Sequence, residues 1–247
     1  LWKEPLSKFS AYHGYWPISF NQIDPRFGTP DDFSELIREA HDRNINVLLD
    51  FVAHHVHKEH PYHQKYPDRT TSLYLPDGSL NTERWDEHRL TTWFDVFLPT
   101  LDLQNPEVTE MLVDSAVWWL QAYPFDGFRH DATKHIPETF WRSLTQRVKQ
   151  QIAGPQRRNI YQIGETYGSA ELISSYVGSG MLDGQFDFNV YDAAVAVFAR
   201  EEEPFTRLDQ VLNESFMYYG SHNLMGYITG NQDRARFISY AGGDLKF

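Results

Sequence analysis

Apolar positions along the chain alternate between the spacing of a helix and that of a buried strand. Residues 31–44 carry apolar side chains at helical spacing, among them Phe33 and Ile37. Residues 45–52 (INVLLDFV) form a short, continuous apolar run. The first pattern predicts an amphipathic helix, and the second predicts a strand that is covered on both faces.

The same two patterns recur along the rest of the chain. Further strands are predicted at 124–131, 159–166, 181–189 and 224–233, and further helices at 106–123, 137–153, 169–177, 190–201 and 206–220. Regular alternation of this kind indicates parallel strands joined by helical crossovers, either in an open doubly wound sheet or in a (β/α)8 barrel. No glycine-rich phosphate loop follows a predicted strand, which counts against a nucleotide-binding open sheet.

Residues 56–105 interrupt the alternation. This stretch is polar, aromatic and punctuated by prolines, and it contains no clear helical pattern. Irregular connections of roughly fifty residues are uncommon in compact domains unless they serve a function. We therefore predict an inserted subdomain at 56–105, with residues 1–55 and 106–247 forming the main α/β domain.

Composition narrows the class of partner. The chain has 247 residues, 41% of them hydrophobic, and a net charge of −12. An acidic balance disfavours nucleic acid, whose phosphates need a basic surface, but it does not disfavour a neutral ligand. No apolar run approaches the roughly 18 residues of a membrane span, and no signal-peptide pattern is present. There is no cysteine, which excludes disulfides. We expect a soluble protein without a nucleic-acid or membrane partner.

Charged or polar residues stand at or just after the ends of several of the predicted strands. These residues are Asp50, His54, His55, Arg129, Asp131, Glu165, Asn231 and Asp233. A helix cap or a surface charge explains any one such acid more often than a site does. In a barrel, however, the carboxyl ends of all strands converge on the face that carries the active site. We therefore expect Asp131, Glu165 and Asp233 to share one pocket.

Three carboxylates and an arginine in one pocket indicate glycoside hydrolysis. Arg129 stands two residues before Asp131, so both side chains lie on one face of a strand, and the cation favours an ionised nucleophile. Glu165 follows the apolar residues YQIG, where burial favours the protonated form that a general acid needs. Asp233 would bind sugar hydroxyls and favour the distorted ring.

With these motifs, the chain resembles the α-amylase family of glycoside hydrolases. DFVAHH, GFRHDATKH, GET and GNQD resemble the four signatures of that family and occur in the family's order. Residues 12–29 are similar to the loop after the second strand, and LPTLD (98–102) resembles the signature of the inserted domain. Together these matches cover nearly the whole chain.

The resemblance implies a (β/α)8 TIM barrel with an insertion after strand three. It implies Asp131 as nucleophile, Glu165 as acid/base and Asp233 as transition-state stabiliser. The remaining substrate-binding residues would be His13, Tyr15, Trp16, His55, Arg129, Lys134, His135, Asn231 and Gln232. Within this set, Arg129 would hold Asp131, His55 would bind the sugar at the cleavage subsite, and Tyr15 would stack on that sugar.

The pair Lys134–His135 matches one that is typical of family members that act on α-1,4-glucans, and it would lie on the leaving-group side. The expected function is therefore a retaining hydrolase of starch or maltooligosaccharides. An α-glucan transglycosylase or another α-glucosidase of the same family is the alternative.

Two positions depart from the family's pattern. The first signature usually has Asn where His54 stands, and in many members that Asn binds a structural Ca²⁺. Imidazole is a poor ligand for this oxygen-seeking cation, although Asp102 and the carbonyl of His135 would remain as ligands. The fourth signature usually has His where Gln232 stands, and Gln donates a hydrogen bond but carries no charge. No cofactor is expected for the chemistry itself.

The predicted strands correspond to the family's third to seventh. We therefore expect the first strand, the eighth strand and the usual C-terminal β-domain to lie outside this stretch of sequence, which would be a piece of a barrel.

Two other functions compete with this interpretation. The histidines between His54 and His63 include His55-Val56-His57, which mimics the paired histidines of metal-dependent hydrolase barrels, but the later strands supply no matching His. A non-catalytic relative on the same fold would be expected to have lost the carboxylates, and all three are present. Trp93 and Phe94 are assigned either to sugar stacking or to the core of the insertion.

Overall fold

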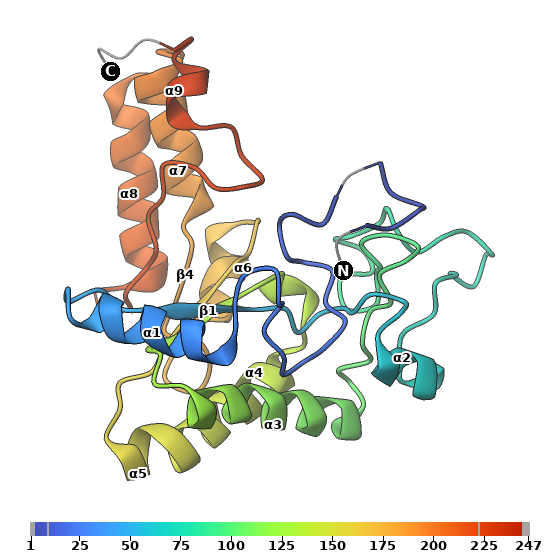
Figure 1. Cartoon of the computed structure of the whole chain (residues 1–247). Helices are drawn as coiled ribbons and strands as arrows, with labels where there is room; N and C mark the ends of the chain where they lie inside the picture. The colour runs from blue at the N-terminus through green and yellow to red at the C-terminus, as the bar shows by residue number, and fades with distance from the viewer. Residues whose placement is uncertain (1–2, 9, 222, 244–247) are drawn as a thin grey trace. The chain divides into compact units, whose positions relative to one another are not determined.

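The computed structural model describes residues 3–8, 10–221 and 223–243 (Figure 1). The chain divides into two compact units, Leu1–Gln162 and Ile163–Phe247. The division falls inside a strand, and the predicted boundary of the subdomain at 56–105 stays a prediction. In the described part of the chain, no helix has both the length and the apolar character needed to cross a membrane.

Parallel strands form the centre of the first unit. Strand β1 (Leu48–Phe51) pairs with β2 (Gly127–His130), and Asp50 lies opposite Arg129 in this register. Strand β3 (Tyr161–Gly164) begins beside β2, where the Tyr161 N–H donates to the Asp126 carbonyl at 2.9 Å. Only glycine fits at Gly127, because a Cβ there would lie 1.8 Å from the Tyr161 carbonyl oxygen.

The predicted helices of this unit are confirmed, and local chemistry sets where they begin. Helix α1 (Pro30–His41) begins with a capping box between Thr29 and Asp32. Helix α3 (Pro106–Ala122) begins after Asn105, whose side chain accepts from the Glu107 N–H. Helix α4 (Glu138–Val148) packs against α3 (Figure 1) and continues through a π-helical turn, Lys149–Ala153, into α5 (Gly154–Gln156).

The insertion is largely irregular. It contains the short helix α2 (Pro61–Lys65) and a 3-10 turn at Pro67–Arg69, neither of which the sequence pattern predicted. Backbone hydrogen bonds join its two ends, because the Leu101 N–H donates to the His54 carbonyl and the Val56 N–H donates to the Pro99 carbonyl. The insertion therefore starts and ends next to the carboxyl end of β1.

The second unit contains the end of β3 and the short strand β4 (Gly184–Gln185), with Ile163 opposite Gly184. Helix α8 (Phe205–Tyr219) packs against α6 (Ala170–Ser175) and α7 (Phe188–Ala194). Helix α7 continues as a π-helical turn, Val195–Ala199, and α9 (Phe237–Tyr240) contacts that turn.

The prediction of a strand at 224–233 is wrong. Residue Gly226 makes a single parallel bridge to Phe186, and the segment then continues as a loop. Gly230 has φ 153°, which interrupts extended structure in the chain that follows. The strand predicted at 181–189 is also shorter than expected, because Asp187 accepts from the Val190 N–H and so begins α7.

Candidate active site

An arginine shared by two carboxylates lies at the carboxyl end of β1 and β2. Arg129 Nη1 donates to Asp131 Oδ1 at 2.7 Å and to Asp50 Oδ1 at 3.0 Å. The Arg129 and Asp131 side chains are only 13% and 12% exposed, so little water screens their ion pair. The alternation of side chains along β2 thus places Arg129 and Asp131 together, as the sequence predicted.

Tyr15 completes this cluster from the N-terminal loop. Its hydroxyl donates to Asp50 Oδ2 at 2.6 Å, and the Arg129 guanidinium lies 5.4 Å from the centre of its ring. Burial raises the pKa of Tyr15, and the negative charge of Asp50 raises it further. The phenol therefore stays protonated and remains a donor.

Asp50 was noted in the sequence only as a residue at a strand end. Loss of water around its carboxyl raises the pKa of Asp50, while Arg129 and the Tyr15 hydroxyl act in the opposite direction. Its position opposite Arg129 follows from strand register, which the sequence pattern alone does not specify. Asp50 therefore orients both Arg129 and Tyr15.

Two histidines lie in the same region. His55 is buried, and its Nε2 lies 2.9 Å from the Tyr15 carbonyl. Burial lowers the pKa of His55, and the nearby charge of Asp131 acts against this lowering. His13 Nδ1 accepts from the Tyr15 N–H at 2.9 Å, and the two rings are stacked at 5.6 Å. The loop therefore brings His13, Tyr15 and His55 to the Asp131 side of the unit.

Trp16, predicted to bind substrate, packs in an apolar cluster and also lines a cavity of this unit, and its use in binding stays a prediction. It is 6% exposed and packs with Ala11, Leu98 and Phe97, whose ring lies 5.0 Å away in an edge-on arrangement. Its ring therefore anchors the loop that carries His13 and Tyr15.

The Lys134–His135 pair follows Asp131 in a tight turn. Ala132 adopts a left-handed conformation (φ 51°), and Thr133–His135 form a 3-10 turn. This conformation is costly for a residue with a Cβ, and strained backbone of this kind occurs often at functional sites. The Lys134 ammonium lies 2.6 Å from Asp86 Oδ1, so the insertion contacts this turn directly.

The other two predicted catalytic acids lie in the second unit. Glu165 is buried directly after β3, whereas Asp233 is exposed in the loop that follows the Gly226 bridge. Burial raises the pKa of Tyr167, and the negative charges of Glu165 and Asp233 raise it further. Both acids therefore lie near Tyr167, a residue that was not among the predicted site residues. Its position two residues after Glu165 could have marked it as a candidate.

The Tyr167 side chain connects the segment that follows GET (164–166) with GNQD (230–233). It stacks on Phe188 at 3.9 Å, and its hydroxyl lies 3.4 Å from the Asn231 amide nitrogen. Gln232 Nε2 donates to Asp233 Oδ2 at 3.3 Å, and the Asp233 N–H donates to Asn231 Oδ1 at 3.0 Å. Asn231, Gln232 and Asp233 thus form a local turn beside Tyr167. Use of these residues together with Asp131 in one site stays a prediction.

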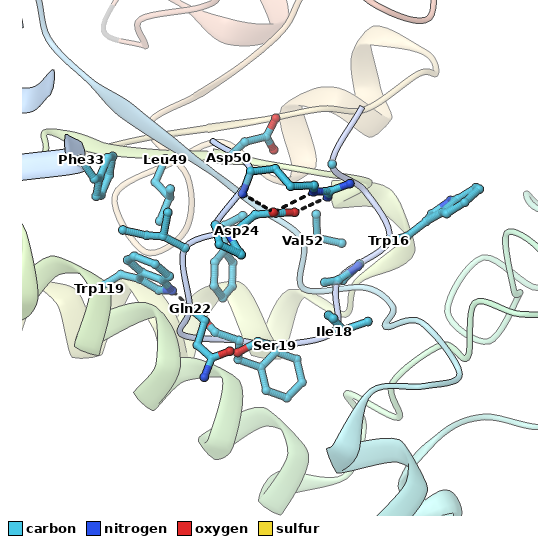
Figure 2. A pocket seen from close by; sticks show the side chains of 17 residues that line it. Trp16, Ile18, Ser19, Gln22, Asp24, Phe33, Leu49, Asp50, Val52 and Trp119 are labelled. Atoms are coloured by element: carbon cyan, nitrogen blue, oxygen red, sulfur yellow. Dashed lines mark hydrogen bonds and ion pairs between the residues drawn. The ribbon is translucent and has the colours of Figure 1, made fainter. Parts of the chain in front are cut away.

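A cavity of about 590 Å³ lies beside the Asp131 cluster in the first unit. Its lining is mostly apolar, with Leu49 from β1 and Val52 just after that strand, and the ion pair between Asp24 and Arg26 lies in its wall (Figure 2). Asp50 is the residue that this cavity shares with the cluster, and Asp131 is not part of the lining. The cavity is therefore a neighbour of the Asp131 carboxylate and does not surround it.

Comparison with known proteins explains why these motifs occur together. The family model "Alpha amylase, catalytic domain" matches residues 1–247. The chain belongs to the α-amylase family. "Alpha-amylase 2" of Dictyoglomus thermophilum is 26% identical over 96% of this chain, and a "Cyclomaltodextrinase" of Geobacillus thermopakistaniensis is 26% identical over 100% of it. The chain spans 40% and 42% of the lengths of these two relatives.

Solved structures of α-amylases share the fold. The α-amylase from Geobacillus thermoleovorans, complexed with acarbose, matches with a TM-score of 0.82 at 32% identity, over 94% of this chain and 50% of its own. An α-amylase from Malbranchea cinnamomea matches with a TM-score of 0.82 at 23% identity, which supports the fold alone. The parallel α/β structure is therefore part of a TIM barrel, as the sequence predicted.

At the position where the resemblance implies a calcium ligand, His54 does not suit that ion. Burial holds the pKa of His54 well below its usual range, so its imidazole is neutral, and the ring stacks on Phe94 at 4.3 Å. Arg89 Nη1 donates to the Lys134 carbonyl at 2.7 Å, which places a cation next to His135. Calcium prefers several oxygen ligands, often negatively charged, and a neighbouring guanidinium opposes its binding.

The histidines of the insertion have structural partners. His57 Nδ1 accepts from the Glu59 N–H at 3.1 Å, and its Nε2 lies 2.9 Å from the buried Glu4 carboxylate. Among the described residues, no group of three or more His, Cys, Asp or Glu side chains is placed to hold a metal ion. The alternative of a metal-dependent hydrolase therefore has no ligand group in that part of the chain.

We predict that chelation changes the stability of the protein little. Because His54 stands where the family usually has an oxygen ligand, adding EDTA should shift the melting temperature by less than about 2 °C. Differential scanning calorimetry with and without EDTA measures this shift. A large fall that Ca²⁺ reverses and Mg²⁺ does not reverse would contradict the prediction.

Proposed function

We propose that the protein is a retaining glycoside hydrolase that acts on α-1,4-glucans, either starch or maltooligosaccharides. The observation that carries the proposal is the 2.7 Å ion pair between Arg129 and Asp131, with His55 and Tyr15 beside it. An ionised carboxylate held in a fixed position is what a nucleophile at an anomeric carbon requires.

In the proposed first step, Asp131 attacks the anomeric carbon while Glu165 gives its proton to the departing glycosidic oxygen. The bond to the leaving sugar breaks as the bond to Asp131 Oδ forms. In the second step, Glu165 takes a proton from water, and the hydroxide displaces Asp131. The proposal requires a carboxyl separation of about 5–5.5 Å between the two residues. The Glu165 side chain is buried directly after β3.

The preference for α-1,4-glucans rests on the turn after Asp131. Lys134 and His135 correspond to a pair that is typical of family members with this substrate, and the insertion holds both residues in place. The relatives named α-amylase and cyclomaltodextrinase support a glucan substrate. Asp233 and Asn231 would bind sugar hydroxyls at the cleavage subsite.

One prediction from the proposed mechanism concerns stereochemistry. Two successive displacements return the original configuration, so the intact protein should release the α-anomer from maltooligosaccharides. Proton NMR of the anomeric signals in the first minutes of reaction measures this outcome, before mutarotation mixes the anomers. Initial release of the β-anomer would show inversion and would contradict a nucleophilic role of Asp131.

Another prediction separates the role of Glu165 from that of Asp131. Glu165→Gln should lower the rate on maltooligosaccharides by about 10²–10⁴-fold, because an alkoxide leaving group needs a proton. The same variant should cleave an α-glycosyl fluoride with a much smaller loss, because fluoride leaves without strong assistance. Glu171→Gln, a change of an exposed acid on α6, is the matched control and should leave both rates unchanged. Equal losses on both substrates would refute the assignment of Glu165.

A further inference from the structure

One aromatic side chain of the insertion is exposed and yet held in a fixed orientation. Trp85 is 46% exposed, and its indole N–H donates to the Thr82 carbonyl at 2.7 Å. Its ring lies 5.3 Å from that of Phe94 and 6.4 Å from that of His135. Trp93, by contrast, is 7% exposed and donates to the Thr71 hydroxyl, so it belongs to the core of the insertion.

Three contacts fasten the segment after Trp85 to the turn that carries Lys134 and His135. The Lys134 ammonium lies 2.6 Å from Asp86, and Arg89 Nη1 donates to the Lys134 carbonyl at 2.7 Å. The third contact joins His135 Nδ1 to the Arg89 carbonyl at 2.9 Å. Trp85 therefore has a defined place relative to this turn.

The surroundings of Trp85 have the chemistry of a sugar subsite. An aromatic ring packs well against the apolar face of a pyranose, and charged groups at its edge bind the sugar hydroxyls. Asp86 adds a carboxylate whose side chain is 86% exposed, and the Lys134 ammonium adds a donor. A bound sugar thus has a flat apolar surface at Trp85, an acceptor at Asp86 and a donor at Lys134.

We propose that Trp85 is a platform for a glucosyl unit on the leaving-group side of the cleavage point. This inference rests on the proposed function and on the family resemblance, which implies that Lys134 and His135 lie on that side. Trp85 is then a specificity-determining residue that favours substrates with glucosyl units beyond the scissile bond.

The test compares two substrates of the intact protein. Maltopentaose occupies subsites on both sides of the cleavage point, whereas α-maltotriosyl fluoride places no sugar on the leaving-group side. Trp85→Ala should lower kcat/KM on maltopentaose by roughly five- to tenfold, the worth of one lost stacking contact. Initial fluoride release from α-maltotriosyl fluoride should stay within about twofold of the unmodified protein, since that substrate gains nothing from the contact.

Two further variants make the result specific. Trp85→Phe keeps an aromatic surface and should recover most of the activity on maltopentaose. Tyr74→Ala removes another exposed aromatic of the insertion and should leave both rates unchanged. Equal loss on the two substrates in Trp85→Ala, or no loss on either, would overturn the inference. Failure of the unmodified protein to cleave either substrate would instead contradict the proposed function, and the inference with it.

Discussion

The ion pairs of Arg129 with Asp131 and Asp50 are the interaction on which the rest of the candidate site depends. One guanidinium between two carboxylates fixes the ends of two neighbouring strands relative to each other, because Asp50 belongs to β1 and Arg129 to β2. Tyr15 is then held by Asp50, and its carbonyl holds His55. Without Arg129, the Asp50 and Asp131 carboxylates would lie near each other without a shared cation, and like charges repel each other.

A second set of contacts makes the insertion part of the site. Residues Asp86 and Arg89 bind the turn after Asp131 through one ion pair and two hydrogen bonds to or from the backbone. These contacts connect the insertion to the turn that carries Lys134 and His135 through side chains of the chain itself.

The sequence predicted those features that depend on residues close to one another in the chain. The helices that begin at Pro30 and Pro106 carry their own caps, and the two-residue spacing of Arg129 and Asp131 predicted that they share a face. The bond from Tyr15 to Asp50 was missed, because residues 35 positions apart meet only through strand register and loop packing. The predicted strand at 224–233 failed for a similar reason. Its apolar pattern was right for a strand, but Gly226 makes the one bridge and the chain then leaves the sheet.

The most direct test of the central claim is to trap the covalent intermediate on the intact protein. A fluorinated α-glucosyl fluoride that forms the glycosyl-enzyme quickly and releases it slowly should add the mass of one sugar. After proteolysis, mass spectrometry should place that sugar on Asp131, and Asp131→Asn should remain unlabelled while keeping its melting temperature. A sugar attached to Glu165 or to Asp233, or turnover of natural substrate by Asp131→Asn, would contradict the account.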